Sequence, residues 1–211
     1  MDDPQAERLI ETATRIFAEL GFDGTSTQLI ADSAGVGMDV LRESAGTKAD
    51  LYRAVMRRAD AAEQEAMRAA MDGFTPSRQG VVALADAYLD FQIARPDVMA
   101  LWLHRWMGDA ADVPGLEDLY TRPLSILVAG AIRDLVPGDV DPDHLVWTVV
   151  WCVYGFLSGG IVYSGPGEPW AFRPIRGQTP EGQERASVER FRAHLHTLLD
   201  HLLTPLDDRR G

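Results

Sequence analysis

The chain has little cysteine, little lysine and no excess of positive charge, and each shortage excludes something. Cys152 is the single cysteine of the 211 residues, so no disulfide can form within one chain. Lys48 is the only lysine among 20 Lys and Arg residues, and 32 Asp and Glu residues give a net charge of −12. Because phosphate neutralisation supplies much of the affinity for nucleic acid, the total charge alone argues against such a partner.

Two further absences narrow the class of protein. The N-terminal stretch MDDPQAERLIE lacks the basic and apolar parts of a secretory signal, so we expect a cytoplasmic location. No segment alternates polar and apolar residues in the manner of a strand, which predicts an all-α protein. An apolar content of 46% and a charged content of 25% are typical of a globular chain of one or two domains.

Helix signals recur along the first fifty-five residues: apolar side chains at three- and four-residue spacing, with a polar residue before them and a glycine after them. They predict helices over 5–20, 29–34 and 38–43, and a long helix from residue 48. The closing glycines are Gly21, Gly35 and Gly46, because a residue without Cβ readily takes the left-handed conformation. Capping boxes are expected at Thr25 with Gln28 and at Thr47 with Asp50.

Two short helices joined by a tight glycine turn behind a longer helix describe a helix-turn-helix. The stretch 21–55, GFDGTSTQLIADSAGVGMDVLRESAGTKADLYRAV, resembles the DNA-binding segment of the TetR (tetracycline-repressor) family. The residues that match the family pattern in frame are Gly21, Phe22, Thr25, Ser26, Ile30, Ala31, Ala34, Gly35, Val36, Leu41, Lys48 and Leu51. The resemblance implies a helix-turn-helix DNA-binding domain over 1–50 and a helical ligand-binding and dimerisation domain over 51–211.

Several positions depart from the family pattern. Gly37 replaces a capping serine, Asp39 replaces a small glycine, and Arg42 replaces a tyrosine that usually contacts a phosphate. Ala45 stands where the family has a large phenylalanine, so Phe17 or Tyr52 would have to fill that space. Residues 1–58 hold seven basic and ten acidic side chains, a net charge of −3, where a duplex-binding module usually has the opposite sign.

The resemblance and the side-chain chemistry together predict the DNA-contacting residues. These are Thr25, Thr27, Gln28, Met38, Asp39, Arg42, Thr47 and Lys48. Thr47 and Lys48 combine a helix N-terminus with a cation, which suits a phosphate. Asp39 could accept a hydrogen bond from a cytosine amino group and otherwise repels DNA.

The remaining sequence predicts helices over 48–71, 78–95, from Pro96 onward, 116–136 and 184–203. The segment 145–163 contains no charged residue and is long enough to span a membrane, but its glycines, its lack of basic flanks and its amphipathic neighbours favour a buried helix. Residues 165–182 form a loop rich in Gly and Pro that contains Trp170 and Phe172.

A ligand pocket and a dimer interface are the sites expected in this region. The aromatic and methionine side chains predicted to line the pocket are Tyr88, Phe91, Met99, Trp102, Trp106, Trp147, Trp151 and Tyr154. They favour a small hydrophobic or aromatic effector, although each of them can equally be part of the core. The resemblance implies a homodimer through the last two helices, with a four-helix interface of two-fold symmetry.

No enzyme motif, metal site or cofactor site is recognisable. Gly35-Val36-Gly37 lacks the third glycine of a dinucleotide loop, and Gly46-Thr47-Lys48 has the P-loop letters in the wrong order. His194, His196 and His201 do not have the spacing of a metal site, and Cys152 lies in an apolar run where thiols are inert.

We therefore predict a ligand-responsive transcriptional regulator, a repressor by its resemblance, that binds a palindromic operator on double-stranded DNA as a homodimer. The alternative is a TetR-like dimer that binds a small molecule or a partner and has lost or weakened its DNA binding. Asp39, Ala45 and the acidic module support that alternative. An unrelated helical enzyme or a membrane protein is the third possibility.

Overall fold

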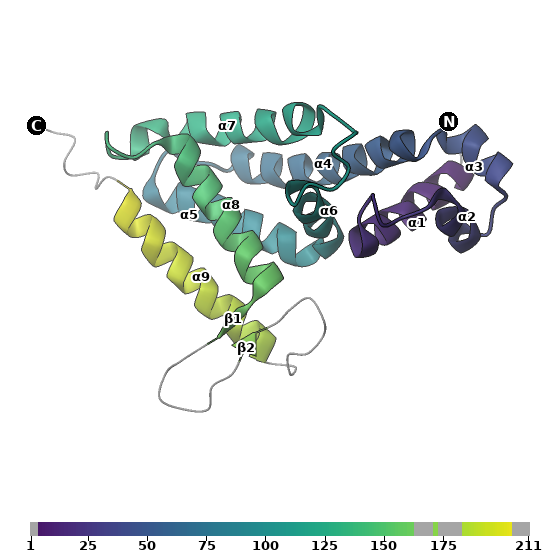
Figure 1. The fold of residues 1–211 in the computed structure, drawn as a ribbon. Helices are drawn as coiled ribbons and strands as arrows, with labels where there is room; N and C mark the ends of the chain where they lie inside the picture. The colour runs from purple at the N-terminus through teal and green to yellow at the C-terminus, as the bar shows by residue number, and fades with distance from the viewer. Residues whose placement is uncertain (1–3, 163–170, 173–182, 204–211) are drawn as a thin grey trace, which may run out of the picture. The chain divides into compact units, whose positions relative to one another are not determined.

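The part of the chain that the structure describes is mostly helical and contains one pair of two-residue strands (Figure 1). The computed structural model describes residues 4–162, 171–172 and 183–203. The chain divides into two compact units, one of Met1–Glu65 with Ala94–Pro123 and the other of Ala66–Ile93 with Leu124–Gly211. The predicted all-α class with an N-terminal helix-turn-helix is confirmed.

The first unit contains the helix-turn-helix. Its helices are α1 (Pro4–Leu20), α2 (Thr27–Ala34), α3 (Met38–Ala45), the start of α4 (Lys48–Asp72) and α6 (Pro96–Trp106), followed by a π-helical turn, η1 (Glu117–Thr121). Helices α1, α2 and α3 pack on one another, and α1 also packs on α6. Phe17, Phe22 and Tyr52 form an aromatic cluster whose ring centroids lie 4.9–5.9 Å apart. Burial of these rings and of the leucines beside them stabilises the module by roughly 1.5–3 kcal/mol for each side chain.

The turns of this unit follow from glycines and caps. Gly21, Gly35 and Gly46 have φ values of 73°, 69° and 72°, as their places after three helices predict. The predicted cap at Thr25 is wrong by one residue, because the Ser26 hydroxyl accepts the hydrogen bond from the Leu29 amide at 3.1 Å. Thr25 and Ser26 are both good capping residues, and the tight turn after Gly21 decides between them by turning the Thr25 side chain inward.

The second unit is built from α5, α7, α8 and α9. The bounds are α5 (Arg78–Ala94), α7 (Arg122–Ile132), a 3-10 turn η2 (Arg133–Leu135), α8 (Pro142–Gly159), β1 (Ile161–Val162), β2 (Ala171–Phe172) and α9 (Gln183–Leu202). Strands β1 and β2 pair antiparallel. Phe156 of α8 stacks on Phe191 of α9 with ring centroids 4.1 Å apart. Arg192 of α9 pairs with Asp86 of α5 at 2.8 Å, so α9 is held by both apolar and charged contacts.

Three sequence predictions about the helices need correction. The helix expected over 116–136 is broken into η1, α7 and η2, since the first turn is wound as a π-helix. Helix α8 begins at Pro142 behind the cap Asp141, and it ends at Gly159 rather than at residue 163. The apolar stripe of 184–203 in the sequence is Val188, Phe191, Leu195, Leu198 and Leu202, but the buried leucines are Leu195, Leu199 and, directly after α9, Leu203.

Within the described residues, no helix combines the length and the apolar character needed to cross a membrane. The loop predicted over 165–182 lies outside the described residues except for Ala171 and Phe172, and so does Trp170.

Candidate functional site

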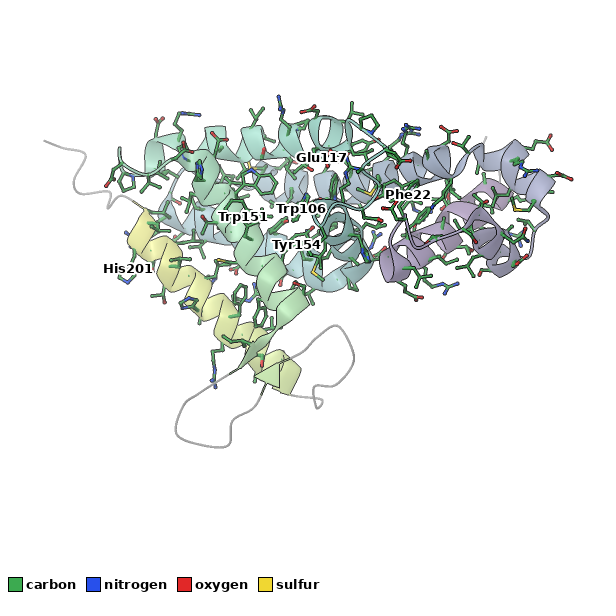
Figure 2. All side chains as sticks on the ribbon, viewed as in Figure 1. Phe22, Trp106, Glu117, Trp151, Tyr154 and His201 are labelled. Atoms are coloured by element: carbon green, nitrogen blue, oxygen red, sulfur yellow. The ribbon has the colours of Figure 1, made fainter. Side chains whose placement is uncertain are left out.

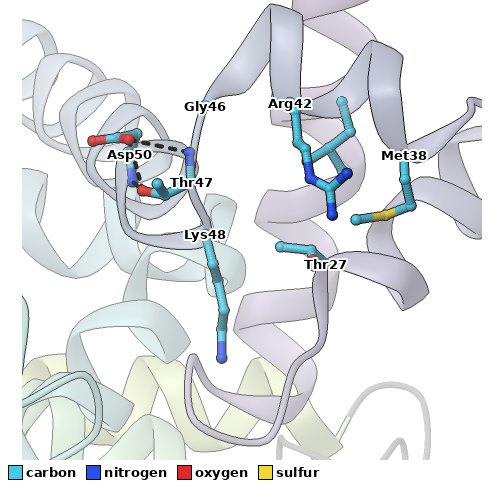
Figure 3. A pocket seen from close by; sticks show the side chains of 8 residues that line it. Thr27, Met38, Arg42, Gly46, Thr47, Lys48 and Asp50 are labelled. Carbon is cyan, nitrogen blue, oxygen red and sulfur yellow. Dashed lines mark hydrogen bonds between the residues drawn. The ribbon is translucent and has the colours of Figure 1, made fainter.

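A hollow of about 470 Å³ opens where α2, α3 and the start of α4 meet (Figure 3). All of these elements belong to the first unit. Its lining residues are Thr27, Met38, Leu41, Arg42, Gly46, Thr47, Lys48 and Asp50. Five of them, Thr27, Met38, Arg42, Thr47 and Lys48, are among the eight predicted DNA-contacting residues.

The N-terminus of α4 forms one wall of the hollow and is closed by the predicted capping box. The Asp50 amide donates to the Thr47 hydroxyl at 3.1 Å, and the Thr47 amide donates to the Asp50 carboxylate at 3.1 Å. The Thr47 hydroxyl also donates to that carboxylate at 2.6 Å, and this hydrogen bond is the first cause of a lowered pKa for Asp50. Thr47 therefore acts as a cap that shapes the helix end, with its hydroxyl already engaged.

The close contact between Gly46 and Asp50 requires glycine. Gly46 has a φ of 72°, and a Cβ at this position would lie 2.9 Å from an Asp50 carboxylate oxygen. The sequence pattern indicates Gly46 only as a helix terminator, and Leu41 and Asp50 were not among the predicted site residues. The capping-box pattern at Thr47 was the signal that could have indicated Asp50.

The charges around the hollow differ from those of the whole module. The lining contains two cations, Arg42 and Lys48, and one carboxylate, Asp50, which is already bonded to Thr47 and to Arg53 at 3.2 Å. Arg42 also pairs with Asp39 at 3.6 Å, and both side chains are exposed. Because exposed ion pairs are weak, Arg42 can leave Asp39 for a stronger anion at small cost. The lining is thus locally positive within an acidic module.

The other three predicted residues lie outside the lining. Asp39 is fully exposed on α3, and the exposed Gln28 amide donates to Asp32 at 2.7 Å. Thr25 is 3% exposed, and its hydroxyl donates to the Gly21 carbonyl at 2.6 Å. A direct contact from the Thr25 hydroxyl to DNA would require breaking this bond, so the structure gives Thr25 a role in the turn.

The predicted effector residues fall in both units. Met99, Trp102 and Trp106 belong to the first, and Tyr88, Phe91, Trp147, Trp151 and Tyr154 to the second. Tyr88, Phe91 and Tyr154 are 3–8% exposed, whereas Trp151 is 57% exposed on the same helix as Tyr154 (Figure 2). The burial of Tyr88, Phe91 and Tyr154 is equally compatible with a pocket wall and with a packed core. The exposure of Trp151 is compatible with neither.

The remaining chemistry-bearing side chains have structural partners. His196 lies 2.8 Å from the Asp86 carboxylate, beside the Arg192 pair that holds α9. Burial raises the pKa of Cys152, which keeps its thiol protonated and unreactive. Within the described ranges, no group of three His, Cys, Asp or Glu side chains is arranged to hold a metal ion.

The fold and the hollow together define an all-helical protein with an N-terminal helix-turn-helix. Comparison with known proteins gives the family. Residues 9–55 match the family described as "Bacterial regulatory proteins, tetR family". Over this N-terminal region the chain is similar to the tetR family, which agrees with the resemblance read from the sequence.

One curated relative and two solved structures extend this result. The HTH-type transcriptional activator FasR of Mycolicibacterium smegmatis is 32% identical over 89 residues, 42% of this chain and 41% of the relative. The chain thus matches about two fifths of the length of that curated relative. The family and the relative are regulatory, which agrees with the prediction that this chain is not an enzyme.

The solved structures show the fold over nearly the whole chain. AibR, in complex with isovaleryl coenzyme A and operator DNA, has a TM-score of 0.69 and 16% identity, covering 92% of this chain and 97% of AibR. A Saccharomonospora viridis protein described as a transcriptional regulator, in complex with choline, has a TM-score of 0.68 and 21% identity, covering 95% and 98%. At these identities the likeness concerns the fold.

Proposed function

We propose that this chain is a transcriptional regulator that binds double-stranded DNA through the hollow bounded by α2, α3 and the start of α4. The observation that carries the proposal is the convergence of five predicted DNA-contacting residues on one locally positive surface. Operator DNA lies in the cytoplasm, so this function requires the location that the sequence predicts.

In this proposal α3 enters the major groove and α4 holds the backbone. The half-buried Met38 can contact a thymine methyl group, and Arg42 can bind a phosphate or the edge of a guanine. Lys48 and the first amides of α4 bind a phosphate, because a helix N-terminus favours negative charge.

Binding to a palindrome requires two copies, and we propose α8 and α9 as the dimer interface. Trp151, Gly155 and Gly159 are exposed at four-residue spacing, so they share one face of α8. The glycines allow a second helix to approach, and the large ring would be buried by it. We therefore assign Trp151 to this interface rather than to the effector pocket.

The proposed effector site is limited to the second unit, around Tyr88, Phe91, Trp147 and Tyr154. The complexes of AibR with isovaleryl coenzyme A and of the Saccharomonospora viridis protein with choline show that this fold accommodates small ligands. An effector would shift the population between dimer forms whose reading heads do or do not match half-sites ~34 Å apart. Met99, Trp102 and Trp106 remain predictions for this role.

The direction of regulation is tested separately from DNA binding. The resemblance predicts a repressor, whereas the curated relative is an activator. A reporter carrying the operator, measured with and without the regulator, distinguishes the two.

DNA binding is tested by fluorescence anisotropy with DNA from upstream of the protein's own gene, at several salt concentrations. We expect sequence-selective binding that weakens with salt. Lys48→Ala should weaken binding to all sequences alike and lower the salt slope by about 0.9 for each lost phosphate contact, hence nearly two for a dimer. Arg57→Ala, at an exposed arginine further along α4 and outside the lining of the hollow, is the matched control.

A second candidate function is favoured by the acidity of the module and by Asp39. In it the protein is a dimer that binds a small molecule or a partner and contacts DNA weakly or not at all. A folded dimer without DNA binding at low salt would establish this candidate and overturn the first. Asp39→Ala refines the test: loss of selectivity at one base pair indicates readout of cytosine, and a uniform gain in affinity indicates repulsion.

A further inference from the structure

Lys48, the only lysine of the chain, lies against an aromatic ring. Its ammonium nitrogen is 4.1 Å from the ring centroid of Phe22. The lysine is half-buried, and among the described residues it forms no ion pair with a carboxylate. Attraction between the cation and the ring face restricts a side chain that otherwise has four rotatable bonds.

Phe22 is itself fixed through both its ring and its backbone. The ring is 5% exposed and contacts Tyr52 at a centroid distance of 4.9 Å. The Phe22 amide donates to one carboxylate oxygen of Asp109 at 2.6 Å, and the Asp23 amide donates to the other at 2.8 Å. The single carboxylate of Asp109, 86 residues beyond Asp23 in the chain, thus binds the two amides that directly follow Gly21.

Gly21 makes this approach possible. It has a φ of 73°, and a Cβ here would lie 3.2 Å from both carboxylate oxygens of Asp109. The turn therefore combines the left-handed conformation with a close contact to the carboxylate, and glycine satisfies both requirements.

The segment that carries Asp109 is anchored within the same unit. Ala110 is fully buried, and the Arg105 guanidinium donates to the backbone carbonyls of Asp109 and Ala110. The same guanidinium pairs with Glu117 at 2.6 Å, which joins the end of α6 to η1. Asp109 is consequently held in place independently of the helix-turn-helix.

We propose that Phe22, clamped by Asp109, is the positioning residue for the phosphate contact of Lys48. The proposal rests on the proposed function, since it concerns how that function's cation is held before DNA arrives. A preorganised ammonium loses less side-chain freedom on binding, which raises affinity without any new contact. The position of the Lys48 ammonium group therefore depends on the segment after α6, because a displacement of Asp109 would release the backbone of Phe22.

The contact is tested first without DNA. Selective isotopic labelling of lysine gives a single set of side-chain signals, because the chain has a single lysine. In the wild type we expect the Lys48 Hε protons upfield of their random-coil position, as protons over an aromatic face are. Phe22→Leu should abolish the shift, Asp109→Ala should reduce it, and Phe22→Tyr should retain it.

The matched control is Phe17→Leu, because Phe17 contacts both Phe22 and Tyr52 in the same cluster and is fully buried. It costs comparable packing but leaves the ring beneath Lys48 in place. A random-coil Lys48 signal in the wild type, or equal loss of the shift in both variants, overturns the proposal.

The functional test is a double-mutant cycle in DNA affinity. Phe22→Leu should weaken operator binding about 2–5-fold for each protomer in the wild type and have no further effect once Lys48 is alanine. An equal effect of Phe22→Leu with and without Lys48 overturns the positioning role and leaves DNA binding intact. Absence of operator binding by the wild type is a different result, since it overturns the proposed function itself.

Discussion

One group of aromatic residues in each unit illustrates two different uses of such side chains. In the first unit Phe17, Phe22 and Tyr52 are 0–5% exposed and contact one another, although they lie under the proposed DNA surface. In the second unit Trp147 and Trp151 lie side by side on α8 with ring centroids 6.0 Å apart, and Trp151 is 57% exposed.

This difference separates two tasks of aromatic side chains. Buried rings in contact with one another set the geometry of a small module whose binding groups are polar and lie above them. An exposed ring beside exposed glycines contributes little to its own unit and is available to a partner. Aromatic side chains therefore form a scaffold in the cluster of the first unit and part of the proposed interface at Trp151.

The largest effect is expected from breaking the buried cluster. Phe17→Ala should destabilise the protein by about 3–5 kcal/mol, because it leaves a cavity among rings that cannot close around it. Urea unfolding followed by circular dichroism measures this. Leu119→Ala, at a leucine 64% exposed in the same unit, should change stability by less than about 0.5 kcal/mol. Similar effects of the two substitutions would contradict the contrast.

Trp151→Ala should affect association far more than folding. Loss of a central aromatic anchor costs about 2 kcal/mol or more, which is roughly a 30-fold weaker dimer. Sedimentation equilibrium measures the dimer constant, and urea unfolding at low concentration should show little change. Ile126→Ala, 60% exposed on α7 of the same unit, is the control. A dimer unaffected by the loss of Trp151 would remove α8 from the interface.

Two carboxyl groups of α4, those of Asp50 and Glu63, differ in the direction of their pKa shifts. At its start the pKa of Asp50 is lowered by hydrogen bonds, whereas burial and the nearby Asp60 raise the pKa of Glu63 from 4.5 to about 7. A raised carboxyl pKa means that the folded state binds the proton more tightly, so stability falls as the pH rises from 4.5 to about 7.

Glu63→Gln should therefore stabilise the protein by about 1–3 kcal/mol above pH 7 and by much less near pH 4. Thermal unfolding across this range tests the sign. The exposed Glu65→Gln, two residues later, should show no such pH dependence. If Glu63→Gln increased stability most at acid pH, the pKa of the Glu63 carboxyl would not be raised in the folded protein.

The smallest expected effect on stability comes from removing either of two buried hydroxyl groups of the first unit. The Tyr52 hydroxyl has no hydrogen-bond partner among the described residues, while the Thr25 hydroxyl donates to Gly21. Tyr52→Phe should be neutral or stabilising by up to about 1 kcal/mol, and Thr25→Val should cost about 1 kcal/mol. Denaturant midpoints of the two variants check the order, and a clear loss from Tyr52→Phe would reveal a partner for that hydroxyl.

The success of the sequence predictions follows the range of the interactions. Gly35, Gly46 and the Thr47 capping box were predictable because each acts within four residues. The cap at Ser26 was missed because Thr25 satisfies the same local pattern, and only the packing of the preceding turn chooses between them. The π-helical turn at Glu117–Thr121 was missed because Glu117 is drawn to Arg105, twelve residues earlier.

The candidate site divides in the same manner. The letter pattern predicted Lys48 and Arg42, because it records residue types at fixed spacing. It could not predict that Thr25 is turned inward or that Trp151 is exposed. Those outcomes depend on which helix face meets a neighbour, and the spacing within one helix leaves that open.

The sequence by itself determined the all-α class, the helix-turn-helix and the place of the single lysine, since helix periodicity, caps and glycines are local properties. The tertiary structure alone decided that Asp109 binds the turn at Gly21 and that Phe22 lies beneath Lys48. The physical reason is that these contacts join segments far apart in the chain, and their energy exists only after packing has brought the segments together.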